Sequence, residues 1–107
     1  WFSSCSLEEG ASMADAMKAH GQYAAAMRDK GAEGGSSWAF VPTLGGASPD
    51  FDYYHVSAWT RYADFGKGYD IYFNGGGMAA MEEATEGVVS CDAPRIYDAQ
   101  LVVKAAE

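Results

Sequence analysis

The sequence predicts an α+β domain in which a four-stranded antiparallel sheet carries its helices on one face. Residues 51–59 alternate strictly between two side-chain rows, which is typical of a strand with two different faces. Residues 13–27 carry apolar side chains at spacings of three and four, which indicates a helix packed along one stripe. Further stretches with strand or helix character flank these two and complete the pattern.

The composition indicates one globular domain spanning residues 1–107. Of the 107 residues 49% are hydrophobic, which suffices for a single core. The net charge of −8 disfavours nucleic acids and anionic membranes as partners, because both are negatively charged. No apolar run approaches the roughly 20 residues of a membrane span. The chain begins with Trp1, which suggests a processed or trimmed product, and we expect a signal peptide to have been removed.

The first part of the chain predicts a strand and a long helix. Residues 1–6 are expected to form the first strand. Ser12 and Asp15 have the spacing of a capping box, so a helix is expected from there to about Lys30, ending at Gly31. The apolar stripe of this helix is Met13, Ala16, Met17, His20, Tyr23, Ala24 and Met27.

Two neighbouring strands follow, joined by a hairpin-type loop at residues 45–50. Residues 37–44 form the second strand, and Pro42 makes it an edge or bulged strand because proline cannot donate a ladder hydrogen bond. Residues 51–59 form the central third strand. Its more compact row, Tyr54, Val56 and Ala58, is expected to lie under the helices. The opposite face is then a large aromatic surface formed by Trp38, Phe40, Phe51, Tyr53, His55 and Trp59.

The last part predicts a broken helical segment and a fourth strand. Residues 61–73 form a second helix capped by Thr60, and residues 78–89 continue it. The helix is broken between them at the glycine run 75–77, because glycine is costly inside a helix. Residues 95–103 form the fourth strand. The inward residues of the second helix are expected to be Tyr62, Phe65, Tyr69, Tyr72 and Phe73.

This order of elements is the split βαβ, or ferredoxin-like, βαββαβ plan. There the fourth strand pairs antiparallel with the first, so the start of one lies near the end of the other. Cys5 and Cys91 occupy these two places. Separate buried thiols and one disulfide both fit a cysteine pair, and this plan favours the disulfide. A disulfide in turn favours an extracellular or periplasmic location.

Several short motifs run through most of the chain. They are the segment 5–16, Ser37 with Trp38, Phe51-Asp52-Tyr53 with Trp59, the segments 66–70 and 74–77, and Cys91 with Asp92. In this order they resemble dimeric α+β-barrel proteins, and more narrowly a group of small secreted bacterial proteins of that fold. The resemblance implies ferredoxin-like protomers that pair through their sheets. That superfamily includes haem-degrading monooxygenases, other oxygenases, isomerases and ligand binders, so the chemistry stays open.

The candidate catalytic residues are His55 and Tyr53, in the middle of the aromatic row. His55 would act as a haem ligand or general base in a cavity between the sheet and its partner. The alternative is an interfacial histidine that bonds Tyr53 or the backbone. His20 is expected on the other side of the sheet, so the two histidines would share no metal. No group of His, Cys, Asp and Glu has ligand spacing, and we predict no metal site.

The aromatic face leads to the functional hypothesis. We predict a secreted, non-catalytic structural or binding domain, without a cofactor, that self-associates through this face into a dimer, a larger assembly or a filament. The alternative is a small-molecule or haem-binding enzyme of the oxygenase type with its cavity at His55. Such an enzyme would be a cofactor-light or haem-dependent monooxygenase.

Overall fold

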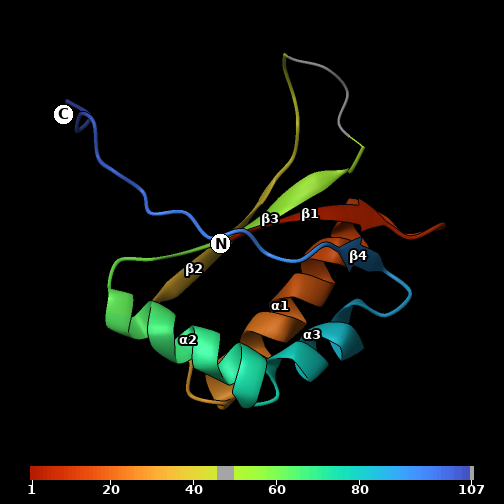
Figure 1. Cartoon of the computed structure of the whole chain (residues 1–107). Helices are drawn as coiled ribbons and strands as arrows, with labels where there is room; N and C mark the ends of the chain where they lie inside the picture. Colours follow the sequence, from red (N-terminus) through yellow and green to blue (C-terminus); the bar gives the residue numbers. More distant parts are fainter. Residues whose placement is uncertain (46–49, 107) are drawn as a thin grey trace.

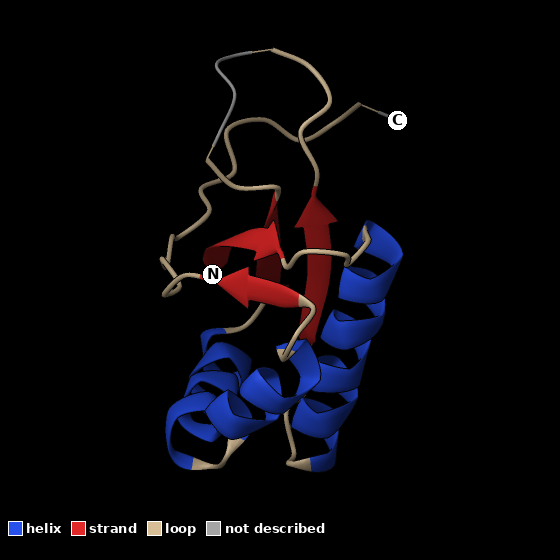
Figure 2. Cartoon of the chain, turned by 90° about the vertical axis from the view of Figure 1, so that its right-hand side faces the viewer, coloured by secondary structure: helices blue, strands red, loops and turns tan. Residues whose placement is uncertain are grey.

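In the computed structural model, which describes residues 1–45 and 50–106, the chain forms a four-stranded antiparallel sheet and three helices. The elements are β1 (Phe2–Leu7), α1 (Met13–Asp29), β2 (Gly35–Phe40), β3 (Tyr53–Trp59), α2 (Tyr62–Asn74), α3 (Gly77–Thr85) and β4 (Val89–Cys91). The strand order is β2-β3-β1-β4. Figures 1 and 2 show the helices gathered on one side of the strands. The predicted α+β class is confirmed, while most of the predicted hairpin-type loop lies outside the described residues.

Helix α1 begins and ends where its sequence predicts. The Ser12 hydroxyl accepts a hydrogen bond from the Asp15 amide at 3.2 Å, and the Ser12 amide donates to the Asp15 carboxylate at 2.9 Å. Gly31, with φ of +101°, follows the helix in the left-handed region that favours glycine. The predicted stripe is wrong at Met17, which is 52% exposed. The buried residues of α1 are Ala16, Ala19, His20 and Met27.

The two faces of β3 are the reverse of the prediction. Tyr53 and His55 are buried on the helix side, and His20 of α1 stacks on His55. Trp59 lies on the same side, so close to Gly68 of α2 that an added Cβ there would be 3.5 Å from the indole ring. The prediction is wrong because it required small strand residues under the helices. Here the helices supply the small residues, and the large strand side chains fill the space between the layers.

Strand β2 is an edge strand, as predicted, because it pairs only with β3 in the described sheet. It begins at Gly35 and ends at Phe40, earlier at both ends than the predicted range 37–44. The strand therefore ends before Pro42, which could not have continued the ladder.

The second helical segment is broken at the glycines, as predicted. Gly76 has φ of +91° and separates α2 from α3. The N-cap is Arg61 and not Thr60, and its side chain makes no capping hydrogen bond. The predicted stripe is wrong at Tyr62, which is 77% exposed. The buried residues of α2 are Gly68 and Ile71. Among the described residues, no helix is both long and apolar enough to cross a membrane.

The predicted position of the fourth strand is wrong. β4 is Val89–Cys91 and pairs with residues 5–7 of β1. Residues 95–103 make only one isolated bridge, between Arg95 and Phe2. The apolar residues that suggested a strand there are exposed, because β1 begins at Phe2, opposite Arg95, and so offers no partner to residues further along. The exposed fractions are 80% for Leu101, 94% for Val102 and 80% for Val103.

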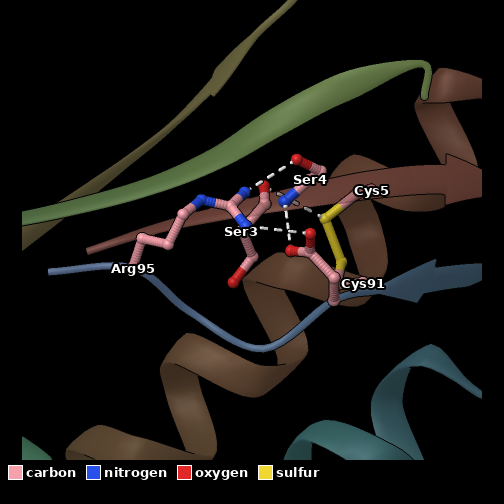
Figure 3. A network of polar contacts seen from close by, with 6 residues as sticks. Ser3, Ser4, Cys5, Cys91 and Arg95 are labelled. Carbon is pink, nitrogen blue, oxygen red and sulfur yellow. Dashed lines mark hydrogen bonds and ion pairs between the residues drawn. A yellow bond between two sulfur atoms is a disulfide. The ribbon is translucent and has the colours of Figure 1, made fainter. Parts of the chain in front are cut away.

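The two cysteines lie directly opposite each other in the register of β1 and β4. Their Sγ atoms are 2.05 Å apart, at disulfide distance, and Figure 3 shows the bond between the two strands. The predicted pairing of Cys5 and Cys91 is confirmed, although Cys91 lies inside β4 and not before it. A bridge across 86 residues stabilises a fold by on the order of 4 kcal/mol in the chain-entropy model.

A polar network holds the chain that leaves β4 (Figure 3). The Ser4 amide donates to one Asp92 carboxylate oxygen at 2.7 Å, and the Arg95 guanidinium donates to the other at 3.1 Å. Arg95 also donates to the Ser4 hydroxyl at 2.8 Å. These bonds continue the contact of β1 with the chain beyond β4, so a strand of three residues stays in register.

Replacing Gly77 by Ala is expected to destabilise the fold. The added Cβ would lie 2.6 Å from Tyr72 Cα and 2.8 Å from Met27 Sδ, and the backbone atom cannot move aside cheaply. Gly66→Ala in α2 is the control, because no atom lies within 4 Å of its added Cβ. We expect the control to be neutral or to stabilise by about 0.5–1 kcal/mol. Urea unfolding measures both, and equal stabilities would contradict the close packing of α3.

Candidate functional site

A partly open cavity of about 910 Å³ lies on the helix side of the sheet. Its wall includes residues from all three helices and all four strands of the described structure. Small-molecule sites commonly measure about 300–1,000 Å³, so the cavity is large enough for one. The polar and aromatic wall residues that matter below are His20, Tyr23, His55, Trp59 and Tyr72.

Two histidines meet at the wall of this cavity. His20 of α1 and His55 of β3 stack with ring centroids 4.0 Å apart and an interplanar angle of 14°. Both are buried, with exposed fractions of 8% and 5%. The prediction that they lie on opposite sides of the sheet is wrong, because β3 turns its other face to the helices. Tyr53, the second candidate residue, joins the group through a hydrogen bond of 2.6 Å between its hydroxyl and His20 Nε2.

Burial keeps these groups uncharged at neutral pH. It lowers the pKa of His55 to about 3, and the neighbouring His20, which would repel a second positive charge if both rings were protonated, lowers it further. Burial also lowers the pKa of His20. For Tyr53, burial and then the neighbouring Asp52 raise the pKa to about 12. The histidines can therefore offer one N–H donor and one acceptor nitrogen each, but no positive charge.

His20 has a fully buried ring nitrogen that lacks a partner among the described residues. His20 Nδ1 is buried and makes no hydrogen bond to any described residue. A nitrogen of the same ring lies within 4.8 Å of the sulfurs of Cys5 and Cys91. Buried polar atoms are normally paired, so an unpaired one calls for an explanation.

The rest of the cavity wall is aromatic and acidic. The Trp1 ring lies 5.1 Å from the Tyr72 ring and 6.3 Å from the Trp59 ring, between centroids. Tyr23 meets His55 edge-on at 6.4 Å. The charged wall residues are Glu8, Arg28, Glu33, Glu82, Glu86 and Asp92. With five carboxylates and one guanidinium, the wall disfavours anionic ligands.

The predicted aromatic surface is divided between the two sheet faces. Tyr53, His55 and Trp59 lie on the helix side. Trp38 and Phe40 lie on the opposite, open face, where they are 48% and 47% exposed. The Phe51 ring packs on that of Tyr54, at 4.5 Å between centroids.

The open face includes residues that the sequence analysis did not assign to it. Phe2 of β1 is central, with its ring 6.2 Å from those of Phe40 and Tyr54 and 5.4 Å from that of Tyr97. Side chains alternate between the two faces along β1, so the sequence could have placed Phe2 on the face opposite to that of Ser3 and Cys5. Tyr97 could not have been found in this way, because it belongs to no strand.

Comparison with known proteins found no match: no protein-family model, no curated protein and no solved structure matches this chain. The inference of function therefore rests on the cavity and on the open face of the sheet.

The free energy of unfolding of the disulfide-bonded protein is expected to fall when the pH is lowered from about 6.5 to about 4.5. In this window the unfolded chain protonates His55 near its ordinary pKa of 6.5, while in the folded state its pKa is about 3. The unfolded state then binds more protons, so the free energy of unfolding falls with pH, by up to about 1.4 kcal/mol per unit for this residue. His20 and Tyr23 of α1 face the His55 ring. The lowered pKa of His20 also makes the free energy of unfolding fall as the pH falls.

Urea unfolding at fixed ionic strength across this window measures the slope. His55→Gln, which cannot titrate, should flatten it, while Lys18→Gln on the exposed side of α1 should not. Equal slopes for the wild type and His55→Gln would contradict a buried, neutral His55.

Proposed function

We propose that the protein is a non-catalytic binding domain with a ferredoxin-like protomer that self-associates through the open face of its sheet. The element order βαββααβ and the strand order β2-β3-β1-β4 support the ferredoxin-like plan. The observation that carries the proposal is the half exposure of Trp38 and Phe40 on a sheet face without helices. Large aromatic side chains of this kind are typical anchors of protein interfaces.

The exposed area supports a partner for this face. The chain exposes 7427 Å². A folded monomer of 11.4 kDa is expected to expose roughly 5,800 Å². The surplus, roughly 1,600 Å², exceeds the roughly 800 Å² that each partner buries in a standard interface. Part of it belongs to the exposed residues 101–103, so both the sheet face and the segment after β4 have area to bury.

The charge distribution favours a second copy as the partner. The strand positions on the open face are Phe2, Ser4, Ser6, Ser36, Trp38, Phe40, Tyr54, Val56, Ala58 and Ser90. None of them is charged, although the chain has a net charge of −8. The Asp92 carboxylate beside Ser4 is paired with Arg95, so two copies can meet through these strand positions without opposing unpaired carboxylates, whereas contacts through the acidic cavity side would bring carboxylates together.

The disulfide supports an extracellular or periplasmic location for this assembly. Disulfides persist in oxidising compartments and are rare where cytosolic reductants act. The bridge also anchors β4, the short edge strand next to β1, and so keeps the open face intact.

Trp38→Ser is expected to weaken self-association by at least about 30-fold, because a buried aromatic anchor at an interface contributes about 2 kcal/mol or more. Size exclusion with light scattering over a range of concentrations measures the change. Phe73→Ser is the matched control, an aromatic residue of α2 that is 42% exposed on the helix side. A wild type that stays monomeric, or an assembly that tolerates Trp38→Ser, would refute the proposed interface.

The cavity supports a second candidate, the binding of a small uncharged molecule at His55. The observation in its favour is a cavity of about 910 Å³ with a neutral imidazole in its wall. Haem, the cofactor of the predicted enzyme alternative, fits this wall poorly. Its two propionates would face five carboxylates and the single guanidinium of Arg28. An apolar molecule with one hydroxyl or amide group matches the wall better, since His55 can bond that group.

Filling the cavity is expected to abolish this binding. Ala24 lines the cavity from α1, while its exposed neighbour Ala25 does not, so Ala24→Trp and Ala25→Trp form a matched pair. An uncharged naphthylamine dye should bind the wild type and Ala25→Trp with one saturable site, and Ala24→Trp at least about 10-fold more weakly. Equal binding by both variants would show that the dye does not occupy the cavity.

A further inference from the structure

We infer that reduction of the disulfide opens a zinc site whose protein ligands are the thiolates of Cys5 and Cys91 and the imidazole of His20. The spacing of these residues in the sequence predicts no such site, because they are far apart along the chain. The fold brings them together: β1 and β4 place the cysteines side by side, and α1 places His20 over them. This site is separate from the open face and does not depend on self-association.

The distances suit a metal ion. One nitrogen of His20 and the two sulfurs all lie within 4.8 Å of one another. Zinc bonds of about 2.3 Å to sulfur and about 2.0 Å to nitrogen place tetrahedral ligands roughly 3.5–3.8 Å apart. In the reduced form, rotation of the two cysteine side chains on the paired strands can bring the sulfurs to about that separation.

His20 is arranged as a metal ligand would be. Its Nε2 shares a hydrogen bond of 2.6 Å with the Tyr53 hydroxyl, and its Nδ1 is buried without a partner. When Tyr53 accepts from Nε2–H, the lone pair of Nδ1 is free. Histidine ligands are commonly oriented in this way by a group that bonds the other ring nitrogen. A metal ion at this site would give the buried Nδ1 of His20 a partner.

The redox step balances with a dithiol as reductant. The dithiol gives two electrons to the disulfide and becomes a disulfide itself, while Cys5 and Cys91 become thiols. Each thiol releases its proton to solvent when Zn²⁺ binds. Two thiolates and a neutral imidazole then leave the site without net charge, which a buried position requires.

The cavity provides access and the fourth position. Cys91 and His20 both line it, so an ion and a water molecule can reach them from that side. Three protein ligands with one open position are the arrangement of catalytic rather than purely structural zinc sites. In the disulfide form the sulfurs bond each other, and the site does not exist. Metal binding is therefore controlled by the thiol redox state.

Zinc titration of both redox forms tests the inference. The reduced chain, freed of reductant under anaerobic conditions, competes with a chromogenic chelator for Zn²⁺. We expect one Zn²⁺ per reduced chain and none per disulfide-bonded chain. Bound Zn²⁺ should also slow alkylation of the two thiols and raise the melting temperature of the reduced form only.

A matched pair of variants separates this site from two cysteines that bind zinc unaided. His20→Gln should weaken binding to the reduced chain by at least about 10-fold. Lys18→Gln on the exposed side of α1, which removes no ligand, should change it by no more than about 3-fold. Should the reduced chain unfold, recovery of its native circular dichroism on adding Zn²⁺ would support the site. Failure of the reduced chain to bind Zn²⁺, or equal affinity in His20→Gln, would overturn it.

Discussion

The packing of α1 against the central strands is the interaction on which the rest of the structure depends. Ala16 of α1 packs in the core with Cys5 and Tyr53 of the sheet, and one turn later His20 stacks on His55 and bonds Tyr53. This contact decides which row of β3 is covered. The cavity lies on the covered side, and the opposite row becomes the open face.

The disulfide is the second constraint, and it acts where the sheet is weakest. β4 has only three residues, and Cys91 ties it to Cys5 in the centre of the sheet. The hydrogen bonds of Asp92 and Arg95 extend that attachment beyond the strand. Because a ring nitrogen of His20 also lies within 4.8 Å of the two sulfurs, the same covalent bond that holds the edge strand would control a metal site.

The two faces of the sheet differ in the chemistry they offer. The strand positions of the open face are uncharged and partly aromatic, and the Arg95 and Asp92 charges that lie beside Ser4 are paired with each other, which suits contact with a second copy of an acidic chain. The helix side combines neutral histidines, aromatic rings and a rim of carboxylates such as Glu82, which suits an uncharged ligand. An assembly through the first face would leave the cavity accessible, so the two proposed functions are compatible.

Local signals in the sequence determined the elements as far as α3, the capping box at Ser12 and the break at Gly76. Through the expected order of elements they also determined the pairing of Cys5 with Cys91, although the fourth strand itself was placed wrongly. Alternation shows that a strand has two rows, but the row that meets the helices depends on how side chains from distant elements fit together. Strand propensity likewise predicted that residues 101–103 belong to a strand. Whether they pair depends on a neighbouring strand with unpaired backbone groups, and β1 does not extend far enough to supply it. The grouping of His20 with both cysteines was decided by the tertiary structure alone, because it joins three elements that no spacing along the chain relates.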